Sequence, residues 1–230
     1  MNIAVFSDKF SGTLSAIEVL DIVQSKFLDS NINADFFSVT DGGQESTEIF
    51  KSHNFQTHES FEALNCDNSL SVVESLNING SIFFESAKLI GVDSENESMS
   101  INTGCLLEAV QKIEVLGTGG SKTIDFGIGL LSKLGMEFIS NGETIVNPVP
   151  KDFSYIDQIK ATNFKSNLEN RILSDTNISL LGENSAFDVF GPQKGLSEKD
   201  IEKHKLEVER LITLIAVSYT HLTLPTNREV

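Results

Sequence analysis

A glycine-rich turn between two apolar segments is the stretch of this sequence best suited to chemistry. Gly117–Ser121 (GTGGS) follows Ile113–Leu116, a short apolar run typical of a strand. Apolar residues then recur at helical spacing within 124–134, which predicts a helix beginning near Lys122 or Thr123. Glycine lets a ligand approach the backbone, and the first N–H groups of a helix have no partner within it, so the pattern indicates an anion site.

A purely structural interpretation of the same turn stays open. Tight connections between strands and helices use glycine for steric reasons alone, and GTGGS matches neither G-x-x-x-x-G-K-[ST] nor G-x-G-x-x-G. Asp125 lies one turn into the predicted helix, where its carboxylate could meet a metal-bound phosphate. It could equally serve as a turn residue.

Two more acidic residues follow predicted strands near the start of the chain. Asp8 comes after Ile3–Phe6, which is typical of a buried parallel strand, and Asp41 comes after Phe36–Val39. A helix with a Ser15 capping box separates the two strands. A further helix over 46–51 completes an alternating order that predicts an α/β sheet. Ligands of such sheets bind beyond the carboxyl ends of the strands, so we expect Asp8 and Asp41 at one edge.

Composition excludes several classes of function. The net charge of −16 argues against nucleic acid or an anionic membrane as a partner, because phosphate contacts need Lys and Arg. The two cysteines have no metal or disulfide spacing. No apolar run reaches membrane-spanning length, and the N-terminus lacks the basic region of a signal peptide. We therefore expect a reducing, cytoplasmic setting.

The middle of the chain has a different pattern of apolar and polar residues. From about residue 55, short apolar segments alternate with polar turns and predict hairpins over 70–73 and 82–84. Further patterns predict a helix over 105–111, a strand over 136–139, and a charged amphipathic helix, capped by Ser197, that runs to about residue 215.

Seven motifs in one order carry a resemblance to a known family. They are SDKFSGTLSA, TDGGQEST, FESAKLIGV, SINTG, LGTGGSKTIDFGIGLLSKLG, SDTNISLLGENSA and VFGPQKG. In this order the chain resembles the bacterial glycerate kinases of the type-1 family from residue 1 to about residue 215.

The resemblance implies an α/β fold with two domains. Residues 1–60 would form the N-terminal part of a Rossmann- or flavodoxin-like parallel-sheet domain that is incomplete here, and residues 61–216 a second, mixed α/β domain that carries GTGGS. Residues 217–230 resemble translated sequencing adapter and are interpreted as foreign to the protein.

The resemblance also implies an activity, which is ATP- and Mg²⁺-dependent phosphorylation of D-glycerate, with the 2-hydroxyl favoured. Catalytic candidates are Asp8, Asp41 and Asp125, of which Asp41 and Asp125 are also candidate Mg²⁺ ligands. Candidates for binding substrate or phosphate are Lys9, Gly42, Gly43, Gly119, Gly120, Ser121, Thr123 and Lys194. The implied partner is a small molecule, without nucleic acid or membrane.

Several positions depart from the family motifs. Glu45 and Phe126 replace glycines, Ile124 replaces asparagine, Lys122 replaces alanine, and Ser11 stands where the family opening has lysine. The changes at Ile124 and Phe126 remove a polar ligand and add bulk at the expected phosphate site. Asn102 also replaces a glycine, a change we expect to be tolerated because asparagine enters positive φ. These departures keep two alternatives open: a catalytically inactive relative that binds or regulates, and a kinase of another small hydroxy acid.

Overall fold

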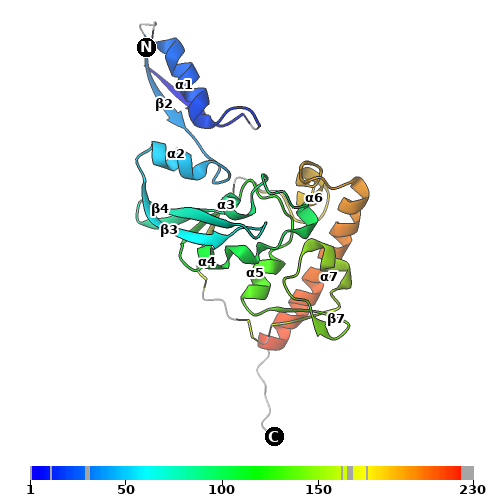
Figure 1. Cartoon of the computed structure of the whole chain (residues 1–230). Helices are drawn as coiled ribbons and strands as arrows, with labels where there is room; N and C mark the ends of the chain where they lie inside the picture. Colours follow the sequence, from blue (N-terminus) through cyan, green and yellow to red (C-terminus); the bar gives the residue numbers. More distant parts are fainter. Residues whose placement is uncertain are drawn as a thin grey trace.

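The computed structural model describes residues 2–10, 12–28, 32–161, 163–164, 168–174 and 176–223, with side chains up to Ser218 in the last range. Ser11, Asp175 and residues 224–230 therefore lie outside the described residues. Figure 1 shows a small N-terminal unit, made of β1, α1 and β2, beside a larger body that contains the remaining elements.

The N-terminal unit is a two-stranded parallel sheet with one helix. β1 (Asn2–Ser7) and β2 (Asn33–Ser38) pair in register along their whole length. α1 (Ala16–Phe27) begins at the predicted capping box, in which Ser15 and Glu18 bond each other's backbone N–H. The parallel pairing confirms the shared edge predicted for the two strands.

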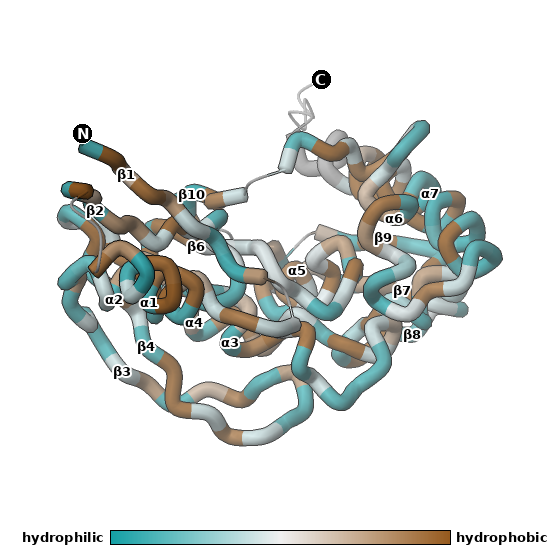
Figure 2. The backbone as a smooth tube through the Cα atoms, turned by 90° about the horizontal axis from the view of Figure 1, so that it is seen from above, coloured by the Kyte–Doolittle hydropathy of each residue, from teal (hydrophilic) through white to brown (hydrophobic). Residues whose placement is uncertain are grey.

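One face of this small sheet is open. α1 packs on the side that carries Phe36, whose ring meets Phe27 edge-on with 5.5 Å between ring centroids. On the other side Phe6 and Phe37 stack at 5.1 Å, and Phe6 is 64% exposed. Figure 2 shows the apolar residues along β1 and β2. The prediction that the first strand is buried is therefore wrong, because among the described residues only α1 covers the pair.

The larger body contains a five-stranded mixed sheet in the order β10-β6-β5-β4-β3. β10 (Arg171–Leu173), β6 (Val115–Gly117) and β5 (Ser81–Glu85) are parallel, whereas β4 (Leu70–Ile78) and β3 (Gln56–Leu64) continue it antiparallel. The predicted hairpins are confirmed. Residue 60, the expected domain boundary, falls inside β3.

Short helices cover this sheet and bury its core. They are α2 (Ser46–Ser52), α3 (Ala87–Ile90), η1 (Ser98–Ser100), η2 (Thr103–Leu106) and α4 (Leu107–Val110). The core contains Phe84, Leu89, Ile101 and Ala109, each with at most 1% of its surface exposed.

A second core lies between a small sheet and the C-terminal helices. β7 (Glu137–Ser140) pairs with β8 (Glu143–Thr144) and β9 (Gln158–Lys160). Around it lie α5 (Ile128–Lys133), η3 (Pro150–Tyr155), α6 (Ala186–Phe190), η4 (Pro192–Lys194) and α7 (Glu198–Thr223). Phe138, Phe153, Phe187 and Leu211 fill this core. Among the described residues, no helix is long and apolar enough to cross a membrane.

The helix predicted to start near Lys122 begins six residues later, at Ile128. Residues 120–122 instead pair with the end of α3 and the residues directly after it: Val92 N donates to Gly120 O and Lys122 N to Ile90 O. Phe126 and Gly127 then adopt left-handed φ values of 56° and 71°. A tertiary bridge followed by left-handed backbone delays the helix in spite of its apolar spacing, so the predicted start is wrong.

Candidate functional site

Two glycine loops meet backbone to backbone between the N-terminal unit and the larger sheet. One follows β2 and contains Gly42 and Gly43, and the other follows β6. A Cβ on Gly117 would lie 2.0 Å from Gly42 O, and a Cβ on Gly43 would lie 2.8 Å from the Cα of Gly119. No side chain fits at these positions, so glycine is needed for the close approach.

Asp41 lies directly beside this contact. Its Oδ1 accepts a hydrogen bond of 2.7 Å from Gly43 N, which fixes the turn. Among the described residues nothing donates to its Oδ2. The side chain of Asp41 is therefore held in place by its own loop through Oδ1, and Oδ2 is available to bind a ligand.

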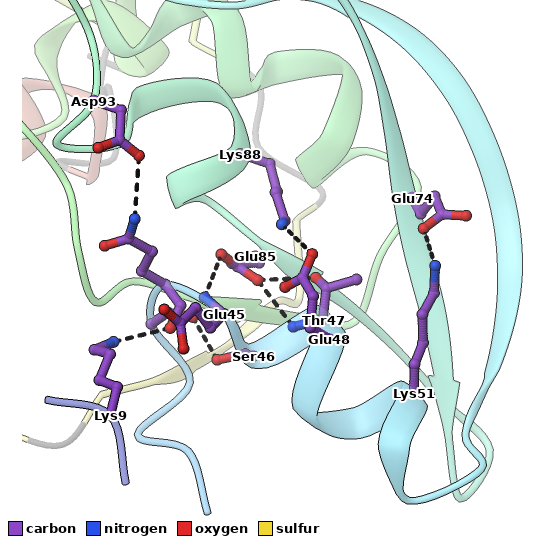
Figure 3. Close-up of polar contacts among 12 residues, drawn as sticks. Lys9, Glu45, Ser46, Thr47, Glu48, Lys51, Glu74, Glu85, Lys88 and Asp93 are labelled. Atoms are coloured by element: carbon purple, nitrogen blue, oxygen red, sulfur yellow. Dashed lines mark hydrogen bonds and ion pairs between the residues drawn. The ribbon is translucent and has the colours of Figure 1, made fainter. Parts of the chain in front are cut away.

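Asp8 and Lys9 approach the same place from the end of β1. Val39 N bonds Ser7 O at 3.0 Å, so the loops after the two parallel strands leave the sheet at one edge, as predicted. Asp8 is exposed and its Oδ1 accepts from Lys9 N. Figure 3 shows Lys9 pointing toward the loop after β2, where its Nζ donates to Gln44 O at 2.9 Å.

The loop after β6 presents backbone donors. Among the described residues, no acceptor is found for the N–H groups of Gly119, Gly120 and Ser121, and Gly120 has a φ of 76°. Exposed successive N–H groups can cradle an oxyanion. That these three residues bind phosphate stays a prediction.

Lys194 holds the end of the same loop from the C-terminal side. Its Nζ donates to Ser121 O, to Ser121 Oγ at 3.1 Å and to Thr123 O at 3.2 Å. Burial and the nearby charge of Lys122 lower the pKa of Lys194 to about 8. Thr123 is buried and its hydroxyl bonds Ser98 O at 2.9 Å, so its side chain serves the packing of the loop.

Asp125 stabilises the start of α5. It is 4% exposed, and its carboxylate accepts from Thr103 Oγ1 at 2.5 Å, Thr103 N at 3.3 Å, Gly127 N at 2.8 Å and Gly129 N at 3.4 Å. Burial raises its pKa above that of an ordinary aspartate. Leu130 N, also in the first turn, donates to Thr103 Oγ1.

An anion site at the start of this helix is therefore excluded, because its first N–H groups already have acceptors. Mg²⁺ is commonly held by one or two carboxylates together with substrate phosphates. Asp41 fits that chemistry, since one of its oxygens is available, whereas both oxygens of Asp125 are engaged. The described residues contain no group of three or more His, Cys, Asp or Glu side chains that could hold a metal. The metal and catalytic roles of Asp8, Asp41 and Asp125 stay predictions.

Glu85 is a residue that sequence reasoning missed. It ends β5, is 1% exposed, and caps the start of α2 from outside that helix: Oε1 accepts from Glu45 N at 3.1 Å, and Oε2 accepts from Thr47 N and Oγ1, both at 2.9 Å. Burial raises the pKa of this carboxyl. Figure 3 shows it pointing into the first turn of α2. The motif FESAKLIGV contained Glu85, but only the fold reveals its partners.

The neighbouring Ser86 N donates to Gly117 O at 3.0 Å. The end of β5 thus joins α2, which follows the Asp41 loop, to the strand that leads into GTGGS. Glu85 and Ser86 fix both glycine loops relative to each other.

Two departures from the family glycines fall at left-handed positions. Glu45 has a φ of 74° and Phe126 a φ of 56°, whereas the six other described non-glycine residues with positive φ are all asparagine. Asn102 differs, since its φ is −104° and its side chain bonds Gly104 N and Pro148 O. The expectation that Asn102 uses positive φ is wrong. This asparagine instead joins two loops.

Comparisons with known proteins agree on one family. The model described as the Glycerate kinase family matches residues 3–226. A glycerate kinase of Bacillus subtilis (strain 168) is 26% identical over 219 residues, which are 85% of this chain and 56% of that protein. A glycerate 2-kinase of Escherichia coli (strain K12) is 24% identical over 222 residues, 86% of this chain and 57% of that protein.

A solved structure also matches. The crystal structure of a glycerate kinase 2 from Salmonella typhimurium LT2 aligns with a TM-score of 0.67 at 21% identity, and it covers 95% of this chain and 63% of that one. At this identity the likeness shows the fold, which is the α/β fold expected from the sequence. The chain spans a little over half the length of the curated relatives it matches.

Proposed function

The chain belongs to the glycerate kinase family, and we propose that its two glycine loops form part of a site that transfers the γ-phosphoryl group of ATP to a hydroxyl of D-glycerate, the 2-hydroxyl being favoured. The observation that carries this proposal is the contact of the Gly42–Gly43 loop with the loop after β6. It brings together Asp41, Lys9 and backbone N–H groups that have no acceptor among the described residues.

Phosphoryl transfer depends on positioning and on neutralising charge. In the proposed reaction an oxygen of glycerate bonds to the γ-phosphorus, the bond from that phosphorus to the β-phosphate oxygen breaks, and ADP leaves. The N–H groups of Gly119, Gly120 and Ser121 bind phosphate oxygens. Lys9 and Lys194 supply positive charge on either side of them.

Asp41 has the chemistry for the remaining role. Its available Oδ2 either accepts the proton of the attacking hydroxyl or binds Mg²⁺, which when bound would neutralise charge on the phosphates. The exposed carboxylate of Asp8 at the same edge is the alternative proton acceptor. We further propose a cytoplasmic location and no nucleic-acid or membrane partner.

The test is ADP release by the full chain with ATP, Mg²⁺ and D-glycerate. Asp41→Asn should lower turnover about 100-fold, because the amide can neither take the proton nor balance the metal charge. Asp35→Asn is the matched control, since this exposed β2 carboxylate lies outside the site. Turnover that Asp41→Asn leaves unchanged would remove Asp41 from the mechanism.

A non-catalytic relative is the second candidate. The strained Glu45 and Phe126 beside the two loops favour it, because both stand where the family motifs have glycine. The folded wild-type chain would then bind glycerate measurably in calorimetry but release no ADP when glycerate is added to ATP. That result would replace the kinase proposal with this one. The third hypothesis is a kinase that phosphorylates another small hydroxy acid. A panel of such acids in the same ADP-release assay tests it.

A further inference from the structure

A lysine-rich pocket lies on the C-terminal side of the GTGGS loop. It has a volume of about 580 Å³ and is lined by four lysines: Lys122, Lys151, Lys194 and Lys203. The remaining lining comes mainly from the segment 95–99 and the first turns of α7. In a chain with a net charge of −16, this lining has a formal charge of about +1, because its four lysines outnumber its three acidic residues.

Three acidic residues also line the pocket, and two of them already have partners, one of which is the pocket lysine Lys151. Glu97 pairs with Lys151 at 2.8 Å, and Asp200 accepts from Ser197 Oγ at 2.5 Å at the start of α7. Glu95 is exposed. Lys203 lies 3.5 Å from Glu207, which is outside the lining.

Lys122 and Lys194 differ from the other two lysines because neither forms an ion pair with a carboxylate among the described residues. Lys122 Nζ donates to Val92 O at 3.2 Å, which leaves it two further N–H donors. The charge of Lys194 is surrounded by neutral oxygens, as described above. An anion bound next to both side chains would therefore be attracted by two positive charges that no carboxylate among the described residues neutralises.

We propose that this pocket binds a small phosphate-bearing molecule through Lys122, with Lys194 adding the second positive charge. The described lining contains no Phe or Tyr on which a nucleobase could stack, and its chief apolar contributions are Met99 and Leu196. The ring of His204 also lines the pocket, but it is only 6% exposed and already packs edge-on against Phe153. A small phosphorylated acid therefore suits it better than a nucleoside. Lys194 also belongs to the proposed kinase site, but binding in the pocket requires no catalysis.

The test is calorimetric titration of the full chain with inorganic phosphate at pH 7 and constant ionic strength. Lys122→Ala should weaken phosphate binding about tenfold, the effect of one lost charge-assisted contact. Lys160→Ala is the matched control, because this exposed lysine of β9 carries the same charge and lies outside the pocket. It should leave the dissociation constant unchanged.

A second readout separates the pocket from general charge effects. A bound anion raises the pKa of Lys194 from about 8, so phosphate binding at pH 8 should take up protons. The measured enthalpy should then depend on the ionisation enthalpy of the buffer, and that dependence should shrink in Lys194→Met. Absence of saturable phosphate binding, or equal binding by Lys122→Ala and the control, would overturn the proposal.

Titration with ATP and with 2-phosphoglycerate identifies the source of the phosphate. If Lys122→Ala weakens the binding of 2-phosphoglycerate but not of ATP, the pocket prefers a small phosphorylated acid. If it weakens only the binding of ATP, that preference is overturned. Both measurements are made without turnover. A chain that binds phosphate through Lys122 but releases no ADP would refute the proposed function and leave this inference standing.

Discussion

Replacing Glu45 with glycine should raise the free energy of unfolding by about 1 kcal/mol. Glu45 holds a left-handed φ of 74°, which costs a residue with a Cβ roughly 1–2 kcal/mol. Glycine removes this cost. It also lowers the free energy of unfolding by roughly 0.5–1 kcal/mol, because glycine gives the unfolded chain more conformational freedom. Glu45 Oε2 is also buried without a hydrogen-bond donor among the described residues, and its removal adds to the gain.

The assay is urea unfolding followed by circular dichroism, with Glu45→Ala beside Glu45→Gly. Alanine also removes the buried oxygen but keeps a Cβ at the same φ, so the difference between the two variants isolates the backbone. We expect glycine to be the more stable by about 0.5–1 kcal/mol. An alanine variant as stable as the glycine variant would refute the argument that Glu45 is strained by its backbone.

Two further predictions concern buried charges. Glu85→Ala should lower the free energy of unfolding by about 3 kcal/mol in the same assay, because Glu45 N and both donors of Thr47 lose their buried acceptor; a loss below about 1 kcal/mol would mean that water replaces the carboxylate. The pKa of Lys194 in the folded protein, about 8, lies below the 10.5 of an ordinary lysine. The unfolded chain therefore binds more protons between these two pH values, and the free energy of unfolding should rise with pH across this window. The rise should be about 3 kcal/mol and absent from Lys194→Met. Equal pH dependence of the two proteins would contradict the burial of this ammonium.

The parts of the fold that depend on local sequence were predictable. The capping box of Ser15 and Glu18 starts α1 where the spacing indicates, because its partners are three residues apart. The edge shared by Asp8 and Asp41 followed from a rule about parallel strands, which needs only the order of the elements.

The parts that depend on distant segments were not predictable. The start of α5 moved because Ile90 and Val92 pair with the residues after Gly119, which no periodicity within 113–134 reveals. Glu85 caps a helix that lies about 40 residues earlier in the chain, so its role becomes visible only when β5 and α2 are adjacent. The side chain of Asn102 likewise bonds Pro148 O, far along the sequence.

The contact of Gly43 with Gly119 means that the two halves of the proposed site are held in different ways. Asp41 is bonded to its own turn, and that turn is pressed against the loop after β6, so it stays with the larger body. Asp8 and Lys9 belong to β1 and its loop, and Lys9 reaches the Asp41 loop through one hydrogen bond. The N-terminal unit is also joined to the larger body by Ser38, whose hydroxyl and carbonyl oxygens bond Ser52 and His53. The position of Asp8 relative to Asp41 therefore depends on a few side-chain hydrogen bonds, whereas the position of Asp41 is set by a backbone contact that no side chain can enter.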